Sequence, residues 1–273
     1  MSQDSAIAPE LESCADLPGS VVYSRRGAVV TLRINRPEKR NAMTFETISG
    51  LREGIHRARE AGGVRVLVLT GTGEKAFCAG GDLGGMTGGD AEAGHEGRGQ
   101  LARLFNDLWD NGIPTIAKVR GYALAGGMGL ALACDIVIAA DDAVFGTPEA
   151  AVGLWPYMIT VPLLRSMPAK VALELMMTGR RILAEEASKL GFVSRVVPAD
   201  RIDATVDEVA RNIAKNSPAA IRLGRTAFYQ VLDMPAAQAL PLLQAGLGIA
   251  AGTADAIEGT LAFAEKRPPV WGS

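Results

Sequence analysis

The 273-residue sequence predicts an α/β fold in which a core of strands and helices is followed by a helical C-terminal region. Two observations carry this prediction. Short apolar runs typical of strands recur between residues 21 and 146 and alternate with segments of helical periodicity. From residue 161 onward the periodicity is mostly helical, and glycines at positions 179, 191 and 252 follow expected helix ends. A chain of this length can bury a sizeable core.

The first elements are a hairpin, a helix and a covered strand. Residues 21–35 predict a β-hairpin, because large apolar side chains stand at alternate positions of its second strand. Thr44 is a suitable N-cap for a helix that we expect to run to about residue 61. The uninterrupted apolar run at residues 64–70 is typical of a strand covered on both faces.

Later segments continue the alternation. Residues 86–98 are rich in glycine and acidic side chains and lack periodicity, so we interpret them as a mobile loop. We expect strands at 115–119, 135–140, 143–146 and 192–197, and helices at 100–109, 129–133, 170–178, 184–190, 203–215, 219–232, 236–251 and 255–266. The chain therefore divides into a disordered tail (1–20), an α/β core (21–198) and a C-terminal helical region (199–273).

Composition argues against several classes of protein. A formal net charge of −2 gives no electrostatic basis for binding nucleic acid or an anionic membrane surface. No apolar run approaches the ~20 residues of a membrane-spanning helix. The three cysteines and two histidines share no ligand-like spacing, so we expect neither a disulfide framework nor a metal site. The polar, acidic start lacks the features of a signal peptide, which predicts a cytoplasmic protein.

Two glycine-rich turns are the most informative local feature: CAGGD at residues 78–82 and AGGMG at residues 125–129. Each lies where a strand-like run gives way to a helix-like one. Glycine tolerates a positive φ and lets a ligand approach the backbone. Two such turns can direct two peptide N–H groups at one oxygen atom and stabilise negative charge that develops on it. The alternative is that both are simply tight turns of an α/β protein.

Residues 71–76 imitate a dinucleotide-binding fingerprint, because they read G-x-G-x-x-A after an expected strand. No helix follows directly, and no second strand ends in an acidic residue about 20 positions further on. We therefore do not expect nicotinamide or flavin binding.

Eight motifs occur in a fixed order along the chain: RPEKRNAM (36–43), KAFCAGGD (75–82), GYALAGGMG (121–129), FGTPE (145–149), TGR (178–180), AEEA (184–187), GFV (191–193) and EGTLAFAEKR (258–267). Together they resemble the enoyl-CoA hydratase/isomerase (crotonase) family over about residues 21–270. The resemblance implies a crotonase-like spiral of ββα units with a C-terminal region used for assembly into a homotrimer or homohexamer. It also implies a lyase or isomerase that acts on acyl-CoA thioesters without a separate cofactor, because coenzyme A is part of the substrate.

Carried over residue by residue, the resemblance assigns the two oxyanion-hole amides to Gly81 and Gly126. It assigns the CoA phosphates to the loop that holds Lys39 and Arg40, although their charges alone favour a solvated basic loop. The other positions that it assigns to substrate binding are Ala42, Ala79, Asp82, Leu83, Gly127 and Gly129.

Phe263 and Lys266 match family positions that reach a CoA bound in part by a neighbouring subunit. By their spacing alone they suit the core face and the solvated end of a terminal helix. Trp155 and Tyr157 suit either the lining of an acyl pocket or core packing.

Glu149 is the expected proton-transfer residue. It follows a strand end among apolar neighbours, which raise the pKa of a carboxyl group and suit it to proton transfer near neutrality. Glu149 also matches one of the two catalytic glutamates of the family's hydratases. The alternative is a surface glutamate that caps the next turn.

The position of the hydratases' other catalytic glutamate holds Gly129. Hydration needs one group to activate water and another to handle the α-proton, whereas moving a double bond from the 3 to the 2 position needs one carboxylate. Family isomerases rely on a glutamate at the position of Glu149. Dienoyl isomerases carry an aspartate where this chain has Tyr157, which disfavours that activity. Some naphthoate synthases have glycine at the position of Gly129 and recruit bicarbonate.

The leading hypothesis is an enzyme that isomerises enoyl-CoA thioesters through an enolate, with Glu149 as the single proton-transfer group. One alternative is an enoyl-CoA hydratase in which a water or an anion replaces the second glutamate. Others are a CoA-binding protein without catalysis and an interaction protein that keeps the fold only for assembly.

Overall fold

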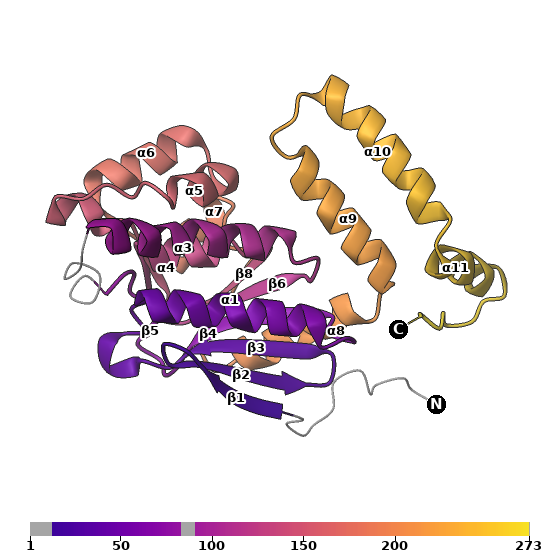
Figure 1. The fold of residues 1–273 in the computed structure, drawn as a ribbon, viewed down its shortest axis with the longest axis horizontal. Helices are drawn as coiled ribbons and strands as arrows, with labels where there is room; N and C mark the ends of the chain where they lie inside the picture. The colour runs from indigo at the N-terminus through magenta and orange to yellow at the C-terminus, as the bar shows by residue number, and fades with distance from the viewer. Residues whose placement is uncertain (1–12, 83–90, 273) are drawn as a thin grey trace.

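Two sheets carry the strands of this protein in a computed structural model that describes residues 13–82 and 91–272 (Figure 1). The larger sheet has seven strands in the order β1-β2-β3-β4-β6-β8-β11, and the smaller has four in the order β10-β9-β7-β5. The strands are β1 (Ser13–Leu17), β2 (Val21–Arg26), β3 (Val29–Ile34), β4 (Val66–Gly71), β5 (Ala76–Cys78), β6 (Thr115–Val119), β7 (Tyr122–Leu124), β8 (Ile136–Ala140), β9 (Val144–Gly146), β10 (Arg181–Leu183) and β11 (Arg195–Val197).

From β4 to β9, consecutive strands alternate between the two sheets. β4, β6 and β8 pair in parallel in the larger sheet, and β5, β7 and β9, which follow them, pair in parallel in the smaller one. The helices α3 (Ala91–Asp110) and α4 (Gly126–Leu132) follow the first two of these strand pairs. Each unit thus gives one strand to each sheet and then a helix, which confirms the predicted spiral of ββα units.

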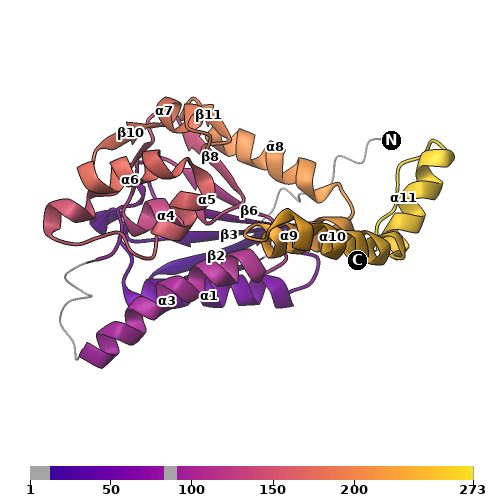
Figure 2. The ribbon, with the colours of Figure 1, turned by 90° about the horizontal axis from the view of Figure 1, so that it is seen from above.

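Helices cover both faces of the larger sheet. Besides α3 and α4 they are α1 (Phe45–Glu60), α5 (Thr160–Ser166), α6 (Ala169–Thr178), α7 (Ala184–Lys189), α8 (Ile202–Ala214), α9 (Pro218–Val231), α10 (Ala236–Ala251) and α11 (Ala254–Ala264), with short 3-10 turns η1 (Pro37–Lys39) and η2 (Pro148–Val152). α1 and α3 lie side by side, as Figures 1 and 2 show from two directions. Thr44 caps α1 as predicted, because its hydroxyl accepts a hydrogen bond from the Thr47 amide at 3.1 Å.

Two hydrophobic clusters explain the uninterrupted apolar run of β4. Leu67 and Leu69 belong to the cluster that includes side chains of α1, α3 and α4. Val66 and Val68, at the alternate positions, belong to a second cluster with Val206 of α8. Because α8 packs on the sheet in this way, the helical region that leaves the core begins with α9. The predicted division of the chain at residue 199 stays a prediction.

Helices α9, α10 and α11 extend away from the two sheets as an arm (Figures 1 and 2). The arm leaves large apolar side chains in contact with solvent, including Leu247 and Phe263, which are 71% and 87% exposed. No single described helix is long and apolar enough to cross a membrane, and α10 and α11 meet the length and hydropathy criteria only as a pair bent by 69°.

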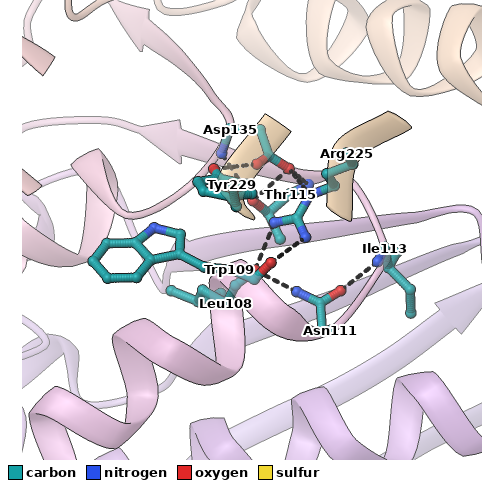
Figure 3. A network of polar contacts seen from close by, with 8 residues as sticks. All are labelled: Leu108, Trp109, Asn111, Ile113, Thr115, Asp135, Arg225 and Tyr229. Atoms are coloured by element: carbon teal, nitrogen blue, oxygen red, sulfur yellow. Dashed lines mark hydrogen bonds and ion pairs between the residues drawn. The ribbon is translucent and has the colours of Figure 1, made fainter. Parts of the chain in front are cut away.

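A polar network attaches α9 to the core (Figure 3). The guanidinium group of Arg225 donates to the carboxylate of Asp135 at 2.8 Å and to the carbonyls of Leu108 and Trp109 at 2.6 and 2.8 Å. The Tyr229 hydroxyl donates to the other oxygen of Asp135 at 2.6 Å. The network therefore ties α9 to the C-terminal end of α3 and to Asp135, just beyond the end of α4.

Two predictions for irregular segments are wrong. Residues 13–17 are not part of a disordered tail, because they pair antiparallel with β2 as strand β1 and bury Leu17. Residues 91–98 are not a loop but the first turns of α3. Their glycines hide the helix from a propensity argument, yet Gly97 lies so close to Phe45 of α1 that a Cβ atom there would be 2.4 Å from the ring. Close packing of two helices overrides propensity at this point.

Candidate active site

The candidate site is assembled at one edge of the smaller sheet. β5, β7 and β9 are parallel neighbours, so their carboxyl ends lie at the same edge. β5 leads into the turn that contains Gly81, β7 leads into Ala125 and Gly126, and β9 leads into Glu149. In parallel sheets this edge is where ligands usually bind. The topology thus brings Gly81, Gly126 and Glu149 to one edge, although Gly126 lies 45 positions after Gly81 and Glu149 lies 23 positions after Gly126.

The first turn directs the Gly81 amide away from the loop that precedes α1. The carbonyl of Gly80 accepts from the Met43 amide at 2.8 Å, and the amide of Asp82 donates to the Met43 carbonyl at 2.8 Å. The C=O of Gly80 and the N–H of Gly81 belong to one trans peptide group and point in opposite directions. Because this carbonyl points to Met43, the N–H of Gly81 points away from Met43.

The second turn is the beginning of a helix rather than a loop. We predicted a helix only from residue 129, whereas α4 starts at Gly126. The reason is a tertiary contact: Gly127 lies so close to β5 that a Cβ atom would be 2.1 Å from the Cys78 carbonyl oxygen. As the first residue of α4, Gly126 has an amide for which the helix itself offers no acceptor.

Backbone strain at the junction of the two turns marks the same place. Ala125 has a φ of 51° and a ψ of −129°, a region that residues with a side chain rarely adopt. Its Cβ lies 2.8 Å from where a Cβ of Gly80 would be, and Gly80 itself has a φ of 108°. Glycine is thus required at position 80 both by the positive φ and by the lack of space for a Cβ atom. Strain of this kind persists at sites where the surrounding structure fixes a functional geometry.

The backbones of Gly81 and Gly126 lie close to each other. The position that a Cβ atom of Gly126 would occupy is 3.9 Å from the Gly81 nitrogen. Among the described residues, no backbone carbonyl accepts from either of these two amides. Two neighbouring N–H groups without a carbonyl acceptor among the described residues are suited to donate together to an oxygen atom on which negative charge develops.

We expect Gly126→Ala to lower kcat by about tenfold to a hundredfold, because the new methyl group would displace an oxygen held between the two amides. The fold should tolerate the change, since the nearest atoms to that methyl are 3.4 Å or more away. Gly127→Ala is the contrasting variant, because its methyl would overlap the Cys78 carbonyl and should lower the melting temperature. Steady-state kinetics with thermal melts would test both, and a Gly126→Ala enzyme with wild-type kcat would contradict the assignment.

Glu149 lies in η2, two residues after the Thr147 that follows β9. A backbone hydrogen bond of 2.8 Å from the Ala125 amide to the Gly146 carbonyl ties the end of β9 to the start of α4. Burial raises the pKa of the Glu149 carboxyl above its ordinary value. One of its oxygens is buried and has no hydrogen-bond partner among the described residues. A desolvated carboxylate with an unused oxygen suits proton transfer.

Gly129 is packed against apolar side chains. A Cβ atom there would lie 2.3 Å from Cγ2 of Ile159 and 3.2 Å from the Phe105 ring. The backbone of α4 thus touches α3 on one side and the residue before α5 on the other. The place where a side chain at position 129 would begin is already filled.

The other predicted substrate-binding residues fall into two groups. Ala42, Ala79, Asp82 and Gly127 lie in or beside the two turns, and the Ala79 amide donates to the Arg40 carbonyl at 3.0 Å. Lys39 and Arg40 are exposed, and the Arg40 guanidinium lies 5.7 Å from the centre of the Tyr122 ring. Leu83 lies outside the described residues.

The remaining predicted residues are not gathered at the sheet edge. Trp155 packs on the core, whereas Tyr157 is 77% exposed. Phe263 and Lys266 belong to α11 and the residues after it, and Figures 1 and 2 place this helix far from α4 within one chain. Within one chain these two residues are therefore not part of the candidate site.

Sequence reasoning missed Asn41 and Arg36, which shape the loop before α1. The fully buried Asn41 amide group donates to the carbonyls of Thr72 and Ala76 at 3.0 and 2.7 Å, and its oxygen accepts from the Arg36 amide at 3.0 Å. Arg40 and Asn41 both adopt a positive φ, 51° and 56°. The signal available in the sequence was a polar residue beside a predicted strand, which is too common to single out.

Among residues 13–82 and 91–272, no group of three or more His, Cys, Asp or Glu side chains is placed to hold a metal ion. Cys78 lies in the first turn, but burial raises the pKa of its thiol to about 12. A thiol with so high a pKa is a poor nucleophile.

Comparisons with known proteins agree with this geometry. The family model described as enoyl-CoA hydratase/isomerase matches residues 24–273. The chain is 36% identical to a carnitinyl-CoA dehydratase of Proteus mirabilis over 259 residues, which are 92% of this chain and 98% of that one. A carnitinyl-CoA dehydratase of Escherichia coli K12 is 37% identical over the same length and shares of both chains.

Solved structures are similar as well. The human enoyl coenzyme A hydratase domain-containing protein 3 superposes with a TM-score of 0.89 at 30% identity, covering 92% of this chain and 100% of that one. An enoyl-CoA hydratase of Mycobacterium smegmatis gives a TM-score of 0.89 at 31% identity, with coverage of 93% and 99%.

Proposed function

This chain belongs to the enoyl-CoA hydratase/isomerase family, and from that premise we propose that it moves the double bond of an enoyl-CoA between the 3 and the 2 position. Membership makes it an enzyme of the crotonase type that acts on CoA thioesters. The choice of isomerisation within the family is our inference from the site.

In the proposed reaction, Glu149 removes the α-proton of a 3-enoyl-CoA. The electron pair moves into the thioester carbonyl, whose oxygen accepts hydrogen bonds from the amides of Gly81 and Gly126. Glu149 then returns the proton to the γ-carbon, which leaves a 2-enoyl-CoA. Proton and electrons balance without water, metal or redox partner. The raised pKa of Glu149 brings it closer to the weakly acidic α-carbon and favours transfer in both directions.

The observation that carries isomerisation over hydration is the packing at Gly129. Ile159 and Phe105 fill the space where a second acid–base side chain would start from this position. A site with one desolvated carboxylate and no acid–base side chain at position 129 suits transfer of one proton between two carbon atoms. Addition of water asks for a second polar group.

We expect Gly129→Glu to lower the free energy of unfolding by about 1–3 kcal/mol without producing hydratase activity, because the added atoms overlap Ile159. Gly129→Ala should also destabilise. Gly224→Ala is the matched control in another helix: nothing lies within 4 Å of its Cβ position, so alanine should stabilise it by about 0.5–1 kcal/mol. Chemical denaturation and a hydration assay test this. A stable Gly129→Glu enzyme that gains hydration would contradict the proposal.

A second candidate is reversible dehydration of a 3-hydroxyacyl-CoA. It is favoured by the relatives named carnitinyl-CoA dehydratase, which are 36% and 37% identical to this chain. In that reaction a water or bound anion would take the part that a second glutamate plays. A CoA-binding protein without catalysis would instead bind acyl-CoA in calorimetry and turn over none of the 2-enoyl, 3-enoyl and 3-hydroxyacyl thioesters.

We also propose how CoA and the assembly fit together. Lys39 and Arg40 would meet the phosphates of CoA, and no separate cofactor is required. The exposed apolar side chains of the arm are suited to contacts between copies in a homotrimer or homohexamer, which would bring Phe263 and Lys266 of one copy to the CoA of another. Sedimentation equilibrium measures the assembly directly, and a monomer at assay concentration would contradict this part of the proposal.

A further inference from the structure

Arg36 links the loop before α1 to the first glycine turn by its side chain. Its guanidinium group forms an ion pair with the Asp82 carboxylate, with 3.0 Å between Nη2 and Oδ2. A second nitrogen of the same group donates to the Ala42 carbonyl at 2.5 Å. The two charged side chains are 17% and 23% exposed, so water screens their attraction less than at an open surface.

This ion pair ends on the residue next to Gly81. The peptide groups on both sides of Gly81 are already fixed by their bonds to Met43. Those two bonds set the direction of the Gly81 N–H only as long as the loop and the turn keep their relative position. Arg36 spans the two segments, because it holds Ala42 in the loop and Asp82 in the turn.

The loop side of this link is itself rigid. The buried Asn41 amide anchors the loop to the residues after β4, and it also accepts a hydrogen bond from the Arg36 backbone. Arg36 therefore extends from a fixed base toward the turn. A charge-assisted hydrogen bond from such a base restrains both the distance and the direction of its acceptor.

We propose that the Arg36–Asp82 ion pair is a positioning device that keeps the Gly81 amide aimed at the thioester oxygen. Neither side chain needs to touch the reacting atoms. This role rests on the proposed enolate chemistry, because it acts through the oxyanion hole.

The isosteric variant Asp82→Asn tests this role. We expect kcat to fall by about tenfold to a hundredfold, as small misplacements of a catalytic group can cause, while KM and the melting temperature stay close to wild type. Arg36→Met should give a similar loss, and the double variant no more than either single one, because each change disables the same pair. Asp203→Asn is the matched control, since it removes a surface ion pair to Lys118 in which Asp203 is 78% exposed.

A spectroscopic probe separates positioning from a purely structural role. A dialkylaminocinnamoyl-CoA absorbs at longer wavelength when its thioester carbonyl is polarised, and it needs no turnover. We expect the bound probe to be red-shifted in the wild type and in Glu149→Gln, and less shifted in Asp82→Asn. An unchanged shift together with an unchanged kcat in Asp82→Asn would overturn the positioning role. A wild type that shifts the probe but isomerises no enoyl-CoA would instead overturn the proposed function alone.

Discussion

Replacing Glu149 with glutamine is expected to lower kcat by about 10²–10⁴-fold, the range that a positioned proton-transfer group contributes. Glutamine keeps the size of the side chain but cannot accept the α-proton. Binding of acyl-CoA should persist, because the amides of Gly81 and Gly126 and the loop of Lys39 and Arg40 are untouched. Glu185→Gln, at an exposed position of α7, is the matched control and should keep wild-type kinetics. If Glu149→Gln also kept wild-type activity, Glu149 would have no part in the reaction.

Burial of Glu149 also predicts how the kcat of the wild type and the stability gained by Glu149→Gln depend on pH. Only the deprotonated carboxylate can remove the α-proton, so kcat should rise with pH through a pKa that lies above the ordinary glutamate value and then level off. When the pKa of a carboxyl group is higher in the folded state than in the unfolded state, the folded protein loses stability as pH rises from the unfolded-state pKa to the folded-state pKa. Glu149→Gln should therefore be more stable than wild type above that window and not below it. Thermal melts across pH measure this difference.

Replacing Asp135 with alanine is expected to lower the free energy of unfolding by about 1–3 kcal/mol, because several partly buried donors would lose the carboxylate that accepts from them. The Arg225 side chain is only 7% exposed and would lose its carboxylate partner. The amide and the hydroxyl of Thr115, which bond to Asp135 at 2.7 and 3.0 Å, would lose their acceptor too. The Tyr229 hydroxyl would lose its partner as well.

The control for Asp135→Ala is Asp203→Ala, because its ion pair with Lys118 lies at the surface and should contribute about 0–1 kcal/mol. Urea unfolding of both variants at one fixed protein concentration gives the comparison, since any association of copies would add to the apparent stability. Because Arg225 also bonds to the end of α3, Asp135→Ala should loosen the attachment of the arm to the core. Equal losses in the two variants would show that the network in Figure 3 carries no special weight.

The sequence predicts strands well where burial is strong and fails where contacts in space decide. The uninterrupted apolar run of β4 and the capped helix α1 are local signals, and both are present near the predicted bounds. β5 and β7 have three residues each, too few for a periodicity to appear, although they carry the two turns. The helical start of α3 depends on the approach of Gly97 to Phe45, a contact between residues 52 positions apart.

The candidate site shows the same division. Glycine-rich turns indicate that backbone groups approach something closely, but no local pattern shows that Gly81 and Gly126 face one another. That depends on β5 and β7 being parallel neighbours. The apolar packing around Gly129 cannot be predicted from the sequence either, because Phe105 and Ile159 lie 24 and 30 positions from it. The resemblance to a family paired Gly81 with Gly126, whereas physical reasoning on the sequence alone could not identify which two amides act together.

The product formed from an unsaturated thioester tests the central claim most directly. Wild-type enzyme is incubated with 3-hexenoyl-CoA and separately with 2-hexenoyl-CoA, and the thioesters are separated by chromatography. We predict that the double-bond isomer forms from either substrate, faster than any 3-hydroxyacyl-CoA, and that Glu149→Gln forms neither. A 3-hydroxyacyl-CoA as the faster product, or binding without any product, would contradict single-glutamate isomerisation at this site.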